Sequence, residues 1–136
     1  KENLERDLAD FFRMFTASRQ DKAEFMTQER ASFFKSICHA MAHKGYLKLF
    51  FLEVNGTRVA VCLCFDFQGQ LYLYNSGYDP SYSSLSVGLI AKAYCIKEGI
   101  AQGRKAFDFL RGPEAYKYHL GGQDQPVYRC VISRPA

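Results

Sequence analysis

Two tight-turn signals in a long apolar stretch constrain the fold of this chain more than any other feature of its sequence. Asn55-Gly56 separates residues 47–54 from residues 58–67, and both flanking runs are rich in apolar and β-branched side chains. Asn-Gly between such runs is a strong signal for a β-hairpin. Gln68-Gly69 makes a second tight turn into residues 71–75. The sequence therefore predicts three consecutive antiparallel strands.

Two helices are predicted before these strands. Apolar residues at helical spacing indicate an amphipathic helix over residues 2–17, and the polar residues 16–22 are predicted to form a loop. Thr27 can cap a second helix, which Gly45 would end.

The second half of the chain alternates between helix and strand. We predict a loop over residues 78–84, a helix over 85–102, a strand over 105–110, a helical turn over 114–120 and a last strand over 127–133. The stripe of the long helix that faces the core is predicted to be Leu89, Ala93, Ile96 and Ile100. The element order ααβββαβαβ predicts a mixed α/β (α+β) fold, with a mostly antiparallel central sheet flanked by helices.

Composition excludes several classes of protein. A chain of 136 residues with 48% hydrophobic residues fits one globular domain. The net charge of +4 is spread along the chain, so no nucleic-acid partner is expected, and no apolar stretch is long enough for a membrane span. Five cysteines without zinc-type spacing are predicted to be reduced core residues of a cytoplasmic protein. His39 and His43 share a helix face but lack further ligands, so no metal site is predicted.

The junction between the third strand and the long helix is one candidate site. A loop rich in Ser and Gly leads from Tyr74, Asn75 and Ser76 into a helix start, where free backbone N–H groups favour an anion such as pyrophosphate. The candidate residues at this helix start are Ser84, Ser86, Val87 and Gly88. The alternative is structural: Ser84 or Ser86 caps the helix, and Gly88 allows close packing.

The segment after the fourth predicted strand is the other candidate. Lys117 lies between Tyr116 and Tyr118, a combination that suits a charge stabiliser and a general acid. Asp108 alternates with two phenylalanines and needs a partner if its face is covered. A structural ion pair with surface aromatic residues explains the same pattern, and His119 is either a base or an exposed side chain.

The ordered set of motifs resembles the CelD/BcsL-like acetyltransferase domains of the GNAT superfamily. The likeness runs from about Leu4 to Arg134. Its motifs are residues 45–56 with Val59-Ala60, Tyr74-Asn75-Ser76-Gly77-Tyr78-Asp79-Pro80, residues 85–88, and Phe107-Asp108-Phe109-Leu110-Arg111-Gly112 with Glu114 and Tyr116-Lys117. Of the standard superfamily loop (Arg or Gln, two residues, Gly, one residue, Gly or Ala), only Gly88 is present.

The resemblance implies an acyltransferase that moves an acyl group, expected to be acetyl, from acyl-CoA to an amine or hydroxyl by direct attack. Residues 74–76 would pair with the pantetheine arm, and Ser84, Ser86, Val87 and Gly88 would hold the pyrophosphate. Lys117 would stabilise charge, and Tyr116 or Tyr118 would supply a proton to the thiolate. Asp108 is expected to orient this segment. Acetyl-CoA or another acyl-CoA is the expected cosubstrate, with no metal.

The closing segment is also similar to the peptidoglycan FemABX aminoacyltransferases, since Tyr116 to Gly121 fits their aromatic-Lys motif. Relatives in both groups often contain two such domains, so residues 1–136 are expected to be one domain, the C-terminal half of a longer protein, that meets a preceding GNAT-like domain or forms a homodimer. The acceptor stays open, with a polysaccharide or cell-envelope precursor among the candidates. Two alternatives remain: a non-catalytic half that binds an acceptor or a sister domain, and aminoacyl transfer from aminoacyl-tRNA.

Overall fold

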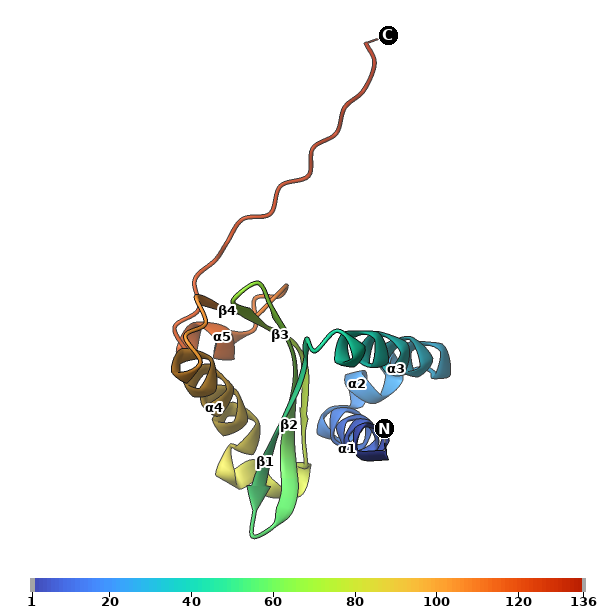
Figure 1. Ribbon diagram of the computed structural model, residues 1–136, viewed down its shortest axis with the longest axis vertical. Coiled ribbons are helices and arrows are strands. Elements are labelled where there is room, and N and C mark those ends of the chain that lie inside the picture. The colour runs from blue at the N-terminus through green and yellow to red at the C-terminus, as the bar shows by residue number, and fades with distance from the viewer. Residues whose placement is uncertain (1, 136) are drawn as a thin grey trace.

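A central sheet with helices on both faces forms the fold of this protein, in a computed structural model that describes residues 2–135 (Figure 1). The elements are α1 (Glu2–Ser18), α2 (Gln20–Phe25), α3 (Gln28–His43), β1 (Leu47–Val54), β2 (Thr57–Phe67), β3 (Gln70–Tyr78), the 3₁₀ helix η1 (Pro80–Leu85), α4 (Val87–Ala101), β4 (Ala106–Asp108) and α5 (Ala115–His119). The predicted α/β class is confirmed.

The sheet has the order β1-β2-β3-β4 and is mixed. Both predicted hairpins are present: Asn55 and Gly56 have φ of 49° and 77°, and Gln68 and Gly69 have φ of 50° and 76°. Two consecutive residues with positive φ are what a two-residue turn of type I′ requires. After α4 crosses the sheet, β4 pairs in parallel with β3 over three residues.

The N-terminal helices differ from the prediction at one place. Thr27 caps α3 as predicted, because its side chain accepts a hydrogen bond from the Arg30 N–H at 3.3 Å. The predicted loop over residues 16–22 is wrong, since α1 continues to Ser18 and α2 begins at Gln20. Arg19, in an extended conformation, is the single break, and its guanidinium binds the Asp21 carboxylate at 2.7 and 2.9 Å.

Two hydrophobic clusters lie on opposite faces of the sheet, and β2 contributes to both. Val61, Leu63 and Phe65 face α1 and α3, while Cys62 and Cys64 face α4. A strand that is covered on both faces has a continuous run of apolar residues in its sequence, which explains the composition of β2. Figure 1 shows this layering, with α1 to α3 on one side of the sheet and α4 and α5 on the other.

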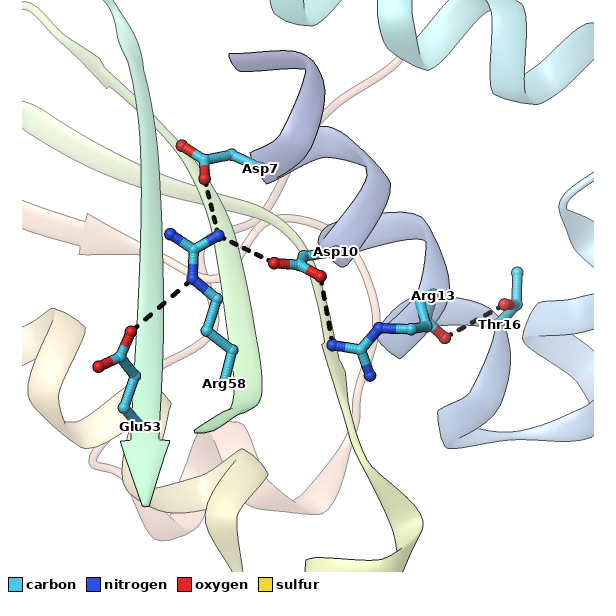
Figure 2. A network of polar contacts seen from close by, with 6 residues as sticks. All are labelled: Asp7, Asp10, Arg13, Thr16, Glu53 and Arg58. Carbon is cyan, nitrogen blue, oxygen red and sulfur yellow. Dashed lines mark hydrogen bonds and ion pairs between the residues drawn. The ribbon is translucent and has the colours of Figure 1, made fainter. Parts of the chain in front are cut away.

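An ionic network fixes α1 against the edge of the first hairpin (Figure 2). Arg58 Nη1 lies 2.7 Å from Asp7 Oδ1 and 2.9 Å from Asp10 Oδ2, both on α1. The guanidinium also lies 3.9 Å from the centroid of the Phe51 ring. These groups are only partly exposed, so their contacts add direction to the apolar packing and are worth about 1 kcal/mol each or less.

The prediction for the face of α4 is wrong. The buried residues of α4 are Val87, Ala91, Lys92, Cys95 and Gly99. Leu89 and Ile100, which were predicted to face the core, are exposed. The helix is apolar nearly all around, so the position of large side chains does not identify its inner face. Small residues four apart face the sheet because they let the helix approach it closely. The predicted loop before α4 forms η1 instead.

The predicted last strand, over residues 127–133, is wrong. This segment has no strand partner and extends away from the sheet (Figure 1). Val127 is 96% exposed and Ile132 is 93% exposed. The preceding strand is shorter than predicted as well, since β4 ends at Asp108 and Leu110 has φ of 57°. A β-prone sequence forms a strand only where an edge is available to pair with it.

Candidate functional site

The unpaired edge of β3 is the main structural feature of the candidate site. Pairing with β4 stops at Tyr72, whereas β3 continues to Tyr78, so residues 73–78 have a strand partner on one side only within residues 2–135. In the pairing with β2, Leu63 is opposite Asn75 and Cys64 is opposite Leu73. Tyr74 is therefore the extra residue of a β-bulge, which bends the strand just where the edge opens.

Backbone groups line this edge, together with small polar side chains. The Tyr74 side chain packs away from the edge, with its ring centroid 5.5 Å from that of Phe34 and 5.0 Å from that of Phe65. The Ser76 carbonyl oxygen accepts a hydrogen bond of 2.7 Å from Lys22 Nζ on α2. Thus the consecutive residues Tyr74, Asn75 and Ser76 all lie on the unpaired part of β3, and Tyr74 contributes only its backbone to the edge.

The start of α4 follows directly from β3 through η1. The Leu89 and Ile90 N–H groups donate to the Ser86 carbonyl oxygen at 3.0 and 3.1 Å. The N–H groups of Val87 and Gly88 precede these bonds and belong to the unsatisfied first turn of the helix. Ser86 has φ of 51°, and its side chain makes no capping hydrogen bond.

The four predicted residues at this helix start have different surroundings. Ser84 and Ser86 are exposed, whereas the Val87 side chain is buried in the core. Gly88 packs against Tyr78, because a Cβ added at Gly88 would lie 3.2 Å from Tyr78 Cδ1. The structural alternative assigns a side-chain cap to Ser84 or Ser86. The N-cap residue is Ser86, and its side chain makes no capping hydrogen bond, while the close packing assigned to Gly88 is present.

Lys117, the predicted charge stabiliser, has its ammonium group enclosed by the preceding loop. Its side chain is buried, with the whole residue 6% exposed. Nζ donates to the carbonyl oxygens of Arg111 and Gly112 at 3.0 Å each, and lies 2.7 Å from Glu114 Oε2. A longer contact of 3.5 Å reaches the Leu110 carbonyl oxygen. The partners of Lys117 in this structure are therefore groups of its own segment.

The other candidates of this segment differ in burial: Tyr116 and Asp108 are partly buried, and Tyr118 is exposed. The Tyr116 ring packs against Phe109, and burial raises the pKa of its hydroxyl to about 12. The exposed Tyr118 hydroxyl donates to Asp124 Oδ1 at 2.8 Å, a bond that raises the pKa of Tyr118. Asp108 accepts a hydrogen bond of 2.7 Å from the Leu110 N–H and so holds the turn after β4.

Sequence reasoning missed two lysines: Lys22, whose Nζ binds the Ser76 carbonyl oxygen, and Lys92 on α4. Lys92 is 8% exposed, and its Nζ lies 4.7 Å from the centroid of the Tyr116 ring. One sequence pattern could have revealed it: the small residues Gly88, Ala91, Cys95 and Gly99 share one face of α4, and Lys92 follows Gly88 by four residues. A charged lysine is unusual on a helix face whose small residues pack against a sheet, and it indicates a specific contact for the ammonium group.

The remaining candidates lie apart from this edge. His39 Nε2 on α3 lies 2.7 Å from Glu5 Oε1 on α1, in an exposed contact. His119 is exposed. Within residues 2–135, no three His, Cys, Asp or Glu residues are grouped as a metal site would need. Cys38, Cys62, Cys64 and Cys95 are buried and unbridged, as predicted. The prediction of a core position is wrong for Cys130, which is exposed because the C-terminal segment extends away from the sheet.

No helix within residues 2–135 combines the length and the apolar character that crossing a membrane requires.

Comparison with known proteins gives one match. A family model described as an acetyltransferase (GNAT) domain matches residues 2–118, which is well over half of the chain. No curated protein and no solved structure matches.

Proposed function

The chain belongs to the acetyltransferase (GNAT) domain family and is thus an acyltransferase domain, and we propose that it transfers an acyl group from acyl-CoA to an amine or hydroxyl. The family membership carries the reaction class. The donor, the acceptor and the roles of individual residues are our proposals.

The unpaired edge of β3 is the observation that best supports acyl-CoA as the donor. Apart from the Ser76 carbonyl oxygen, which Lys22 binds, residues 73–78 offer backbone groups to an extended ligand, in the way a further strand would pair with them. The same strand leads through η1 into the first turn of α4, where free N–H groups and the positive end of the helix dipole favour a pyrophosphate. A pantetheine arm along the edge and phosphates at Ser86 would use both features in one molecule.

The reaction would be direct attack on the thioester. The acceptor nitrogen or oxygen forms a bond to the carbonyl carbon, the carbon–sulfur bond breaks, and the acceptor loses its proton to solvent. Backbone N–H groups near Asn75 would stabilise the oxyanion. Tyr116 suits the role of proton donor to the thiolate better than Tyr118, because Tyr116 is half-buried while the exposed Tyr118 hydroxyl is already bound to Asp124.

Titration calorimetry with CoA, acetyl-CoA and pantetheine tests the donor. Ser86→Asp places a negative charge at the start of α4 in a left-handed conformation that Asp tolerates. We expect this variant to bind CoA about tenfold more weakly, from like-charge repulsion, and to leave pantetheine binding unchanged. Ser32→Asp, on the exposed side of α3, is the control and should match the wild type. Absence of heat with CoA at millimolar concentration would favour the non-catalytic alternative.

The catalytic role of Lys117 stays a prediction, and Lys117→Met tests it. If the lysine stabilises charge at the reacting bond, turnover falls far more than the thermal midpoint. The contacts of its ammonium group support a different role, in which Lys117 holds residues 110–112 in position. In that case unfolding becomes easier by about 1–3 kcal/mol, because the loop carbonyl groups lose a charged hydrogen-bond donor. A variant equally impaired in turnover and stability, or in stability alone, would contradict the catalytic role.

The acceptor, a preceding GNAT-like domain or homodimer, and the cytoplasmic location stay predictions. Screening labelled acetyl-CoA against amine, sugar and cell-envelope acceptors would identify the acceptor.

A further inference from the structure

The outer edge of β1 is another strand edge without a partner in residues 2–135. β1 is the first strand in the sheet order β1-β2-β3-β4, so only β2 pairs with it. Its 8 residues, LKLFFLEV, include Lys48 and Glu53 as the charged side chains and are otherwise apolar. A long apolar edge promotes association with a further strand, and proteins normally cover or interrupt such edges. This edge is therefore suited to pairing with another segment.

A groove of about 310 Å³ lies beside this edge, between β1 and α4. Its lining includes Phe50 and Leu52 of β1 and Ala91, Tyr94, Cys95 and Glu98 of α4. Phe50 and Leu52 are half-buried, whereas the central residues of β2 are fully buried. A strand added at the edge of β1 would continue the sheet, and every second side chain of that strand would enter the groove.

Residues 127–133 of the C-terminal segment have the properties of such a strand. Their sequence, VYRCVIS, is rich in β-branched residues, and the segment extends from the protein with no strand partner in residues 2–135 (Figure 1). Four of its apolar side chains are 71% exposed or more: Val127, Tyr128, Val131 and Ile132. The chain thus contains both a strand without an edge and an edge without a strand.

The side chains of this segment complement the groove in polarity and in charge. Val127, Arg129 and Val131 share one face of an extended chain. Glu98, the carboxylate in the groove lining, is exposed and accepts a hydrogen bond of 2.6 Å from Gln102 Nε2 at Oε1. It forms no ion pair within residues 2–135. Two valines against the apolar wall, with the guanidinium beside Glu98, would match both parts of the lining.

The position of the segment favours the groove of another molecule over its own. The segment follows β4 and α5, whereas β1 is at the opposite end of the sheet order. Three strand spacings, about 14 Å, separate the two ends of a sheet with four strands. To reach its own β1, the segment would have to turn back across the sheet, but it extends away from the folded part (Figure 1).

We propose that residues 127–133 of one copy pair with β1 of a second copy, with Val127, Arg129 and Val131 in the groove between β1 and α4. The exchange is reciprocal and gives a closed dimer. In dilute protein the segment is free, as it is in the single chain described above. The dimer does not depend on the acyl-transfer reaction, because the groove and the edge of β1 lie apart from residues 74–76 and the start of α4.

Sedimentation velocity over a range of protein concentrations tests the dimer, with a reducing agent present so that the exposed Cys130 forms no disulfide. Val131→Asp should stay monomeric where the wild type is dimeric, because it puts a charge into an apolar groove. Ile132→Asp, on the opposite face of the segment, is the matched control and should keep the dimer. Both variants should fold, since neither residue belongs to a hydrophobic cluster. A monomer at all concentrations, or equal effects of the two changes, would overturn the proposal.

A charge exchange tests the register of the segment in the groove. Glu98→Arg and Arg129→Glu should each raise the dissociation constant of the dimer several-fold, because like charges would then meet. The double variant should recover the wild-type constant, since it restores an opposite pair. Arg134→Glu, on the opposite face of the segment, is the control and should leave the constant unchanged. A double variant that dissociates as readily as the single variants would overturn the proposed contact between Glu98 and Arg129.

Discussion

Two buried lysines and one partly buried lysine show how the neighbours of a residue decide its role. Lys117 is surrounded by carbonyl oxygens and a carboxylate, so its charge is compensated and serves the loop before α5. Lys22 and Lys92 have a carbonyl oxygen each and an aromatic ring, so their charges are not compensated. The same type of side chain is a structural cation in one place and an uncompensated charge in the other.

The pH dependence of stability should report the lowered pKa of Lys22. Between pH 8 and 10.5 the unfolded chain keeps the proton on Lys22 while the folded chain loses it, starting from an ordinary pKa of 10.5. Stability contributed by this group therefore rises with pH across that window. The charged and titratable groups facing Lys22 are Arg19, Asp21, Cys62 and Lys92. Urea unfolding at both ends of the window should give a larger rise for the wild type than for Lys22→Met, and Lys35→Met should behave as the wild type does.

Gly77 is the glycine that the packing of α1 requires. A Cβ added at Gly77 would overlap Phe15 N and lie 2.5 Å from Met14 C, both backbone atoms of α1. Gly77→Ala should therefore destabilise the protein by about 1–3 kcal/mol in urea unfolding. Gly99→Ala is the control: its Cβ would meet Leu71 Cδ2 at 3.7 Å, an ordinary contact, and helix propensity favours Ala by up to about 1 kcal/mol. Equal effects of the two changes would contradict the close approach.

At the scale of elements, hairpins and helices differ in how locally they are specified. The turns at Asn55-Gly56 and Gln68-Gly69 fix the pairing of β1, β2 and β3 by their backbone angles alone. The orientation of α4 depends on the sheet beneath it, because several of its faces are apolar. The helix turns its small residues inward, and this also brings Lys92 toward Tyr116.

Two alanines on α4 test which face is buried. Ala91 is buried against the sheet, while Ala93, in the stripe that periodicity favours, is exposed. Ala91→Leu should overfill the contact and cost about 1–3 kcal/mol of unfolding free energy. Ala93→Leu should change it by about 0.5 kcal/mol or less. The reverse order would place the periodic stripe against the core.

At the scale of the whole molecule, two segments lack a strand partner that the sheet could have given them. One is the edge of β3 beyond Tyr72, beside which the candidate site lies. The other is the C-terminal segment, whose residues 123–135 carry no regular structure and extend from the body of the protein (Figure 1). The first is an unpaired edge within the folded part, and the second is outside the hydrophobic clusters.

Limited proteolysis should separate this segment from the folded part. Trypsin is expected to cleave first after Arg129, which is exposed in extended chain, and well before Arg58, whose guanidinium is bound to Asp7 and Asp10. The thermal midpoint should stay the same after this cut, because residues 130–135 lie outside both hydrophobic clusters. Resistance at Arg129 equal to that at Arg58 would mean that the segment packs against the protein.

The sequence alone determined the features that depend on neighbouring residues along the chain. The Asn-Gly turn, the cap at Thr27 and the succession of three strands, a long helix and a fourth strand need only local backbone preferences, and each is present. The ordered motifs also pointed to the GNAT superfamily, which the family match supports. The placement of Tyr74, Asn75 and Ser76 at one strand edge was predictable for the same reason, since they are consecutive.

Only the tertiary structure decided which groups meet across the sheet. Nothing local indicates that Lys22 on α2 would bind the Ser76 carbonyl oxygen of β3, or that Lys92 on α4 would be buried against the Tyr116 ring. The enclosure of Lys117 by Glu114 and the loop carbonyls, the inward face of α4 and the missing last strand also depend on contacts between distant segments. The physical reason is common to all of them. Burial, charge compensation and strand pairing each require a partner from another segment, and the fold decides whether that segment lies nearby.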